Sequence, residues 1–186
     1  MTFLAAEASG FPKHRVMGMA GVLDSARLRF FIAEELGVPP SRVEAIALGS
    51  HGDAMVPLPR HATVEGKPLA ELVDGETLER LFARTRDAGA EIVGLLKKGS
   101  AYYGPSASVA QMVNAIVGDR KEVLPVCAWT TGEYGISDVY VGVPARLGRG
   151  GVEQIVEMDL NDDELAQLRE AAKGIRAKCA DLEHVS

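Results

Sequence analysis

Residues 122–158 read EVLPVCAWTTGEYGISDVYVGVPARLGRGGVEQIVEM and decide the fold class. Three segments of this stretch are rich in valine and other strand-forming residues: 122–130, 138–147 and 151–158. Glycine-containing turns separate them, Thr131-Gly132 after the first segment and 148–151 after the second. Strands joined by short turns form an antiparallel meander, so the stretch predicts an antiparallel sheet.

Helical patterns surround this predicted sheet. Apolar spacing predicts five helices, over 1–9, 22–36, 76–98, 105–116 and 162–182. The helix over 22–36 is apolar on nearly all sides, which is typical of a buried helix. Short strands are expected at 16–20 and 43–48, and an edge hairpin over 55–64 closes at Glu65-Gly66. Because helices and strands do not alternate regularly, the predicted class is α+β, a twisted antiparallel sheet packed with long helices.

Length, composition and charge exclude several classes of protein. The chain has 186 residues, a length typical of one domain, and 47% apolar and 25% charged residues exclude a disordered tail or a coiled coil. The net charge is −6, from 20 Lys and Arg against 26 Asp and Glu. Proteins that bind nucleic acid are normally basic, so we expect no nucleic-acid partner.

Cysteine usage and terminal sequence predict a cytoplasmic protein. Cys127 and Cys179 form no CxxC pair, which fits a reducing compartment, and Cys179 lies on the apolar stripe of the last helix, where a small buried side chain is expected. The segment 1–7 lacks the basic and apolar regions of a signal peptide. The longest uncharged stretch, 99–118, contains several polar residues and Pro105, so we expect no membrane span.

Two charged residues break the apolar pattern of the helix over 22–36. Asp24 and Arg27 lie three positions apart, which places them on one helical face. Charges are rarely buried unless they are paired, so an ion pair within the helix is one interpretation. The other is a carboxylate and a guanidinium that face a cleft, where the guanidinium offers a planar fork to a substrate carboxylate.

A histidine stands between glycines directly after the predicted strand 43–48, in the segment Gly49-Ser50-His51-Gly52-Asp53. Glycine neighbours allow backbone and ligand to approach closely, although a single histidine is more often structural or exposed than catalytic. The remaining histidines have polar neighbours and are interpreted as surface residues: His14, His61 and His184. The four histidines share no ligand spacing, so no metal site is expected.

Two motifs resemble those of the lactate/malate dehydrogenase family: GMAGVLDSAR at 18–27 and GSHGDAMVP at 49–57. Further matches follow in the same order and spacing, KGSA at 98–101, PSASV at 105–109, VLP at 123–125 and GEYG at 132–135. The resemblance covers essentially the whole chain, and LDSAR and HGD at this separation are highly specific. It implies the α+β fold of that family's C-terminal, substrate-binding domain, here residues 1–186.

The resemblance also implies a role for each polar residue of the two motifs. His51 would accept the hydroxyl proton of a 2-hydroxy acid while a hydride leaves for the nicotinamide of NAD. Asp24 would hold the imidazole in one tautomer, and Arg27 would bind the substrate carboxylate. Ala101 stands where lactate enzymes usually have threonine, and the smaller side chain favours malate and oxaloacetate over lactate. Pro105 falls where family members line the nicotinamide, although a proline at a helix start explains it nearly as well.

The family's other half is not recognisable in this sequence. No G-x-G-x-x-G turn is present, so an N-terminal Rossmann domain is expected to be missing, and the choice of NAD over NADP stays open. We therefore expect the isolated chain to be inactive or nearly so, to pair with a Rossmann domain and to form a homo-oligomer. The alternatives are a non-catalytic oligomerisation or binding module and a lactate-type domain. A metal-dependent hydrolase would need clustered ligands that the sequence lacks.

Overall fold

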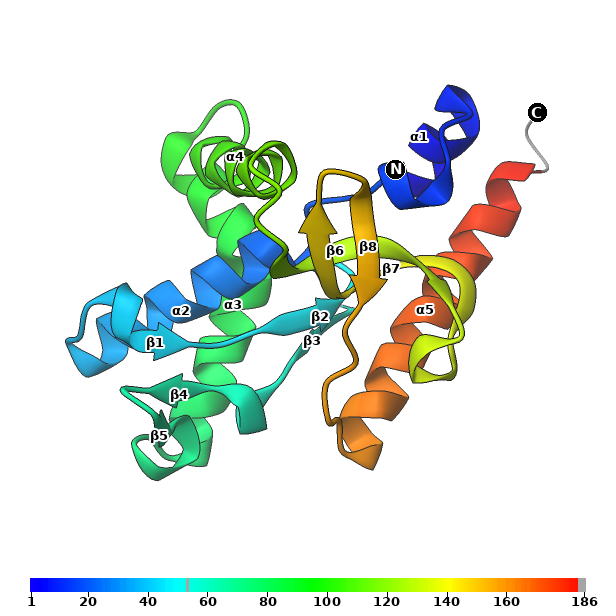
Figure 1. Cartoon of the computed structure of the whole chain (residues 1–186). Coiled ribbons are helices and arrows are strands. Elements are labelled where there is room, and N and C mark those ends of the chain that lie inside the picture. The colour runs from blue at the N-terminus through cyan, green and yellow to red at the C-terminus, as the bar shows by residue number, and fades with distance from the viewer. Residues whose placement is uncertain (53, 184–186) are drawn as a thin grey trace.

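The computed structural model describes residues 1–52 and 54–183 and shows the predicted α+β class (Figure 1). Its α-helices are α1 (Thr2–Ser9), α2 (Gly21–Leu36), α3 (Gly75–Leu96), α4 (Tyr103–Val117) and α5 (Asp162–Glu183). Its strands are β1 (Val43–Glu44), β2 (Ala47–Gly49), β3 (Met55–Pro57), β4 (Thr63–Val64), β5 (Lys67–Pro68), β6 (Glu122–Thr131), β7 (Ser137–Gly148) and β8 (Gly151–Ile155).

The strands form two antiparallel sheets. The larger sheet has the order β3-β2-β7-β6, with β8 also paired to β7, and the smaller one has the order β1-β4-β5. The predicted meander over 122–158 is confirmed, and its centre is the long β6–β7 pair, in which Val126 faces Val143. The third predicted strand, 151–158, is shorter in the structure and ends at Ile155. The last hydrogen bond to β7 runs from the backbone N–H of Val156 to the Pro144 carbonyl, and the chain then leaves the sheet. The turn at Glu65-Gly66 is confirmed between β4 and β5, but the predicted range 55–64 is wrong, because β3 pairs with β2 in the larger sheet.

Two strand predictions are wrong. Residues 16–20 form only an isolated bridge between Gly18 and Cys127, because the chain turns at Ala20 (φ 33°) and enters α2 at once. The predicted strand 43–48 is two strands in different sheets, since β1 pairs with β4 while β2 pairs with β3 and β7. At the break between them, the Arg29 guanidinium donates a hydrogen bond to the Ala45 carbonyl (3.3 Å).

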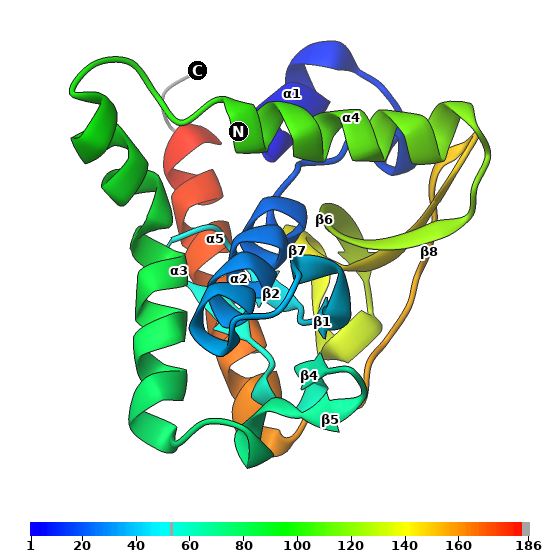
Figure 2. The same cartoon turned by 90° about the vertical axis from the view of Figure 1, so that its left-hand side faces the viewer.

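Helix α2 lies at the centre of the molecule, between the larger sheet and α3 (Figure 2). Val22, near its start, packs in the core of the larger sheet, and Ile32, near its end, packs in a second core with α3. The prediction of a buried helix is therefore confirmed, except that Phe30 is half exposed (50%). Phe30 lies in the lining of a pocket that α2 shares with α3 and the start of α4, which explains its partial exposure.

Helix α5 packs across the larger sheet through the predicted apolar stripe. Leu168 is fully buried, whereas Cys179 is only half-buried, because it lies toward the end of the helix beyond the core cluster. A capping box begins this helix: the backbone N–H of Asn161 donates to Glu164 Oε2 (2.9 Å), and the backbone N–H of Glu164 donates to Asn161 Oδ1 (2.8 Å). Within 1–52 and 54–183, no helix is both long enough and apolar enough to cross a membrane.

Candidate active site

Helix α2 and the loop after β2 bring Asp24 and His51 together, although 27 positions separate them in the chain. Asp24 projects from the first turns of α2 and is buried, with 2% of its surface exposed. His51 follows Gly49, whose positive φ (81°) and close contact with the Ala54 carbonyl leave no room for a side chain. The tight turn at this glycine directs the imidazole toward α2, and Nδ1 lies 2.8 Å from Asp24 Oδ1.

The hydrogen bond fixes how the imidazole can work. The buried carboxylate of Asp24 accepts a hydrogen bond from the Nδ1–H group of His51, which leaves a lone pair on Nε2 in the neutral ring. The same hydrogen bond raises the pKa of His51, and partial burial and the Arg27 charge oppose it. The His51 side chain is 55% exposed, so a small molecule can reach Nε2 from solvent. The pair has the arrangement of a base oriented by a carboxylate.

Arg27 completes this cluster on α2, three positions after Asp24. Its Nη1 lies 3.9 Å from Asp24 Oδ1, at the outer limit of an ion pair and too long for a hydrogen bond. The side chain is 10% exposed, and burial lowers the pKa of the guanidinium. Nη1 is buried, and within the described residues it has no hydrogen-bond partner. A buried donor without an acceptor is costly, so Arg27 carries unused capacity to bind an anion.

A pocket of about 510 Å³ lies among α2, α3 and the start of α4. It brings Arg27 together with Ala101 and Pro105, while His51 does not line it. The predicted site residues thus form two groups that share Arg27. The rest of the lining is largely apolar and includes Leu23, Phe30, Phe31, Ile92, Leu96, Tyr102 and Tyr103. The sequence contains one usable signal for this lining, the adjacent pair Phe30-Phe31 on α2, because neighbours on a helix cannot both face the core.

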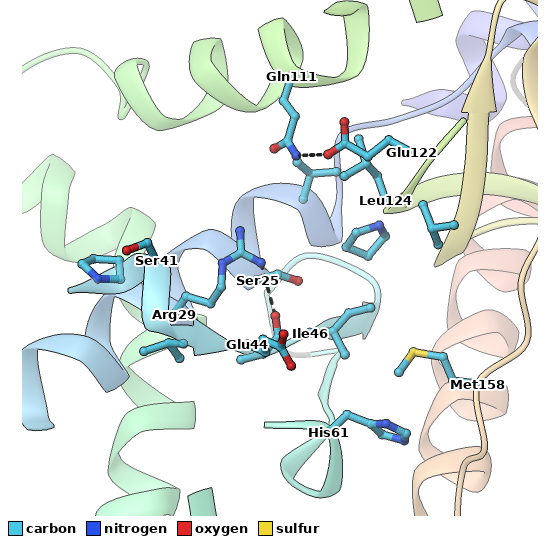
Figure 3. A pocket seen from close by; sticks show the side chains of 16 residues that line it. Ser25, Arg29, Ser41, Glu44, Ile46, His61, Gln111, Glu122, Leu124 and Met158 are labelled. Atoms are coloured by element: carbon cyan, nitrogen blue, oxygen red, sulfur yellow. Dashed lines mark hydrogen bonds between the residues drawn. The ribbon is translucent and has the colours of Figure 1, made fainter. Parts of the chain in front are cut away.

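A second pocket, of about 660 Å³, lies on another face of α2 and contains none of the predicted site residues (Figure 3). Its main polar groups already have partners within the protein. Arg29 donates to the Ala45 carbonyl, and Gln111 donates to Glu122 Oε1 (2.7 Å). Ser25 Oγ accepts a hydrogen bond from the Ala47 amide (3.0 Å). Size alone therefore does not identify the functional site here.

The remaining predicted residues lie apart from both groups. His14 is exposed, and His61 Nε2 lies 2.9 Å from the Asp159 carbonyl, where it ties the start of the α5 segment to the smaller sheet. Asp53 and His184 lie outside the described residues. In the part of the chain that the structure describes, no three His, Cys, Asp or Glu side chains are grouped closely enough to hold a metal ion.

Comparison with known proteins assigns the chain to a family. Residues 21–185 match the family model described as lactate/malate dehydrogenase, alpha/beta C-terminal domain. A malate dehydrogenase of Roseiflexus castenholzii is 52% identical over 185 residues, which covers 100% of this chain and 60% of that protein. The solved malate dehydrogenase of Salinibacter ruber superposes with a TM-score of 0.96 at 50% identity, over 99% of this chain and 60% of that one. A lactate dehydrogenase of Cryptosporidium parvum has a TM-score of 0.90 at 39% identity, over 95% of this chain and 60% of that one.

The chain belongs to the lactate/malate dehydrogenase family and has the fold of its C-terminal domain. It spans about 60% of the length of the curated relatives that it matches. Within the described residues, no glycine-rich turn joins a strand to a helix in the manner that holds the pyrophosphate of NAD. The residues present therefore do not fit a complete cofactor site.

Proposed function

We propose that residues 1–186 are the substrate-binding, catalytic part of an enzyme that oxidises malate to oxaloacetate with a nicotinamide cofactor. One observation carries this proposal: the 2.8 Å bond between His51 and the buried Asp24 lies beside a buried guanidinium that has an unused donor. A structural ion pair would use Arg27 to neutralise Asp24, but Asp24 gives its close contact to the histidine instead. The names of the relatives at about 52% identity support malate as the substrate.

In this proposal, His51 is the base that moves the proton of the substrate hydroxyl. Its Nε2 accepts that proton, because Nδ1 is already occupied by the bond to Asp24. The imidazolium that results is stabilised by the buried carboxylate at 2.8 Å, and in the reverse direction it returns the proton. The raised pKa of His51 makes the ring a better proton acceptor than an isolated imidazole.

Arg27 binds and orients the substrate. Its guanidinium offers two parallel N–H groups to the two oxygens of a carboxylate, and this pairing satisfies the buried Nη1. The bound carboxylate is held close to His51, since both residues contact the same Asp24. Ala101 lines the same pocket as Arg27, and its small side chain favours a dicarboxylate over lactate.

The reaction also needs a hydride acceptor, and the nicotinamide cofactor of the family, NAD, supplies it. The described residues do not make a complete cofactor site. We therefore propose that turnover requires a Rossmann domain, corresponding to the part of the longer relatives that this chain does not cover. Pro105 lines the same pocket as Arg27, and we propose that it contacts the nicotinamide. Self-association and a cytoplasmic location remain predictions of the sequence.

The test is to fuse the N-terminal part of the Salinibacter ruber enzyme to this chain and to follow NADH oxidation. We expect the fusion to reduce oxaloacetate much faster than pyruvate, the His51→Asn fusion to be inactive although folded, and the chain alone to be inactive. A preference for pyruvate would favour the lactate-type alternative. A stable fusion without either activity would favour the non-catalytic module and contradict the proposal.

A further inference from the structure

Helix α3 passes close to the Arg27 guanidinium at Gly89. A methyl group placed on Gly89 would lie 3.9 Å from both Nη1 and Nη2 of Arg27, and no other atom would be within 4 Å of it. Glycine is the least favourable residue in a helix interior after proline, and Gly89 lies in the middle of a 22-residue helix. Nothing in the turn geometry of α3 requires it, because its φ is not positive. The contact with Arg27 is the feature that distinguishes this position.

The side chains of α3 become smaller toward this contact. On its buried face, Leu81 and Phe82 are followed by Thr85 and Ala88, and Gly89 comes next along the helix. Ala88 lines the pocket that also contains Arg27. The guanidinium thus lies between the carboxylate of Asp24 on α2 and the part of α3 that has the smallest side chains. Within the described residues, its buried Nη1 has no hydrogen-bond partner.

We propose that Gly89 is a positioning residue, which keeps the Arg27 guanidinium flat against α3 with both Nη atoms available to a substrate carboxylate. The inference rests on the proposed function, because it takes Arg27 as the group that binds the substrate. A side chain at position 89 begins 3.9 Å from both Nη atoms, so we expect one longer than a methyl group to crowd the guanidinium. The residue acts on affinity through Arg27 and does not itself touch the substrate.

The chain offers a matched control on the same helix. A methyl group on Gly94 would meet nothing within 4 Å, so Gly94→Leu adds the same side chain without touching Arg27. Gly89→Ala places its methyl at an ordinary contact distance and should be tolerated. Gly89→Met has a volume similar to leucine but is more flexible, and it provides a second long variant should Gly89→Leu fail to fold.

The experiment titrates oxalate, a planar dicarboxylate, into the 186-residue chain and follows the Arg27 Nε–H signal by NMR. Trp129, the single tryptophan, reports folding from the larger sheet, away from α3. We expect Gly89→Leu or Gly89→Met to weaken oxalate binding by at least about tenfold and to shift the Arg27 signal before any ligand is added. Gly94→Leu should leave both unchanged, and Gly89→Ala should retain nearly all of the affinity.

The outcomes separate the two proposals. Oxalate binding that is lost in Arg27→Lys but unchanged in both long variants at position 89 would overturn the role of Gly89 and leave the proposed function standing. An equal loss in Gly94→Leu would also overturn it, since the effect would then be a general one on α3. If oxalate causes no shift at Arg27 in the unmodified chain, both the proposed function and this inference are contradicted.

Discussion

Two arginines lie two positions apart on α2 and are used in different ways. Arg29 donates to the Ala45 carbonyl at the point where the chain passes from the smaller sheet to the larger one (Figure 3). Arg27 faces Asp24 at 3.9 Å and has a buried Nη1 with no partner in the described chain. Burial lowers the pKa of both guanidinium groups.

The comparison shows which of the two arginines the fold itself uses. The hydrogen bond of Arg29 stabilises a strand break, so its role is complete within the protein. Arg27 instead retains a buried Nη1–H donor that has no partner within the described residues. This donor lowers the free energy of unfolding until a ligand accepts a hydrogen bond from it. Such local costs are typical of functional sites, where stability and activity have opposing requirements.

Asp24→Ala is expected to reduce the free energy of unfolding by about 3 kcal/mol, because it leaves the Arg27 guanidinium buried without a neighbouring carboxylate. It also removes the acceptor of the His51 hydrogen bond. Urea denaturation measures the change. The control is Asp159→Ala, which removes an exposed carboxylate that is paired with Arg60 and should cost less than about 1 kcal/mol. Equal losses of unfolding free energy in the two variants would show that Asp24 contributes no more to stability than an exposed ion pair does.

Arg27→Met is expected to lower the affinity for oxalate by roughly 10- to 100-fold, as the loss of a charged hydrogen-bonding group predicts. Its free energy of unfolding should stay within about 1 kcal/mol of the unmodified chain, because the substitution also removes an unsatisfied buried donor. Calorimetric titration and urea denaturation together test both parts. A variant that loses several kcal/mol of stability would identify Arg27 as a structural residue.

Arg29→Met is expected to have the opposite profile. It should lower the free energy of unfolding by about 1 kcal/mol, through loss of the bond to the Ala45 carbonyl, and leave oxalate affinity unchanged. The same two measurements apply. Weaker oxalate binding in this variant would mean that the pocket around Arg29 also takes part in ligand binding.

His51 should give the smallest effect, a pH-dependent contribution to stability. Its folded pKa is raised by the hydrogen bond to Asp24, above an ordinary value of 6.5. The contribution is therefore fully present below the unfolded pKa and is lost as the pH rises through the higher folded pKa. Unfolding of the unmodified chain and of His51→Gln should differ more at low pH than at high pH. A difference that grows with pH would contradict the raised pKa.

The sequence predicted the helices well because their signals are local. Gly37 ends α2, and Asn161 with Glu164 begins α5, as the cap patterns indicate. The split of 43–48 was missed because it depends on which distant strands are available for pairing. The spacing of Asp24 and Arg27 left two interpretations open, and the resemblance linked Asp24 to His51. The contact of Gly89 with Arg27 depends on how α3 packs on α2, which no local pattern encodes.

The most direct test of the central claim is the protonation state of the His51 ring, measured by ¹⁵N NMR in the neutral form. We expect a proton on Nδ1, held by Asp24, and a bare Nε2 that is free to accept a substrate proton. Asp24→Asn should remove this preference and lower the pKa of the ring. A proton found on Nε2 in the unmodified chain, with the same pKa in Asp24→Asn, would contradict the proposed role of His51 as the base.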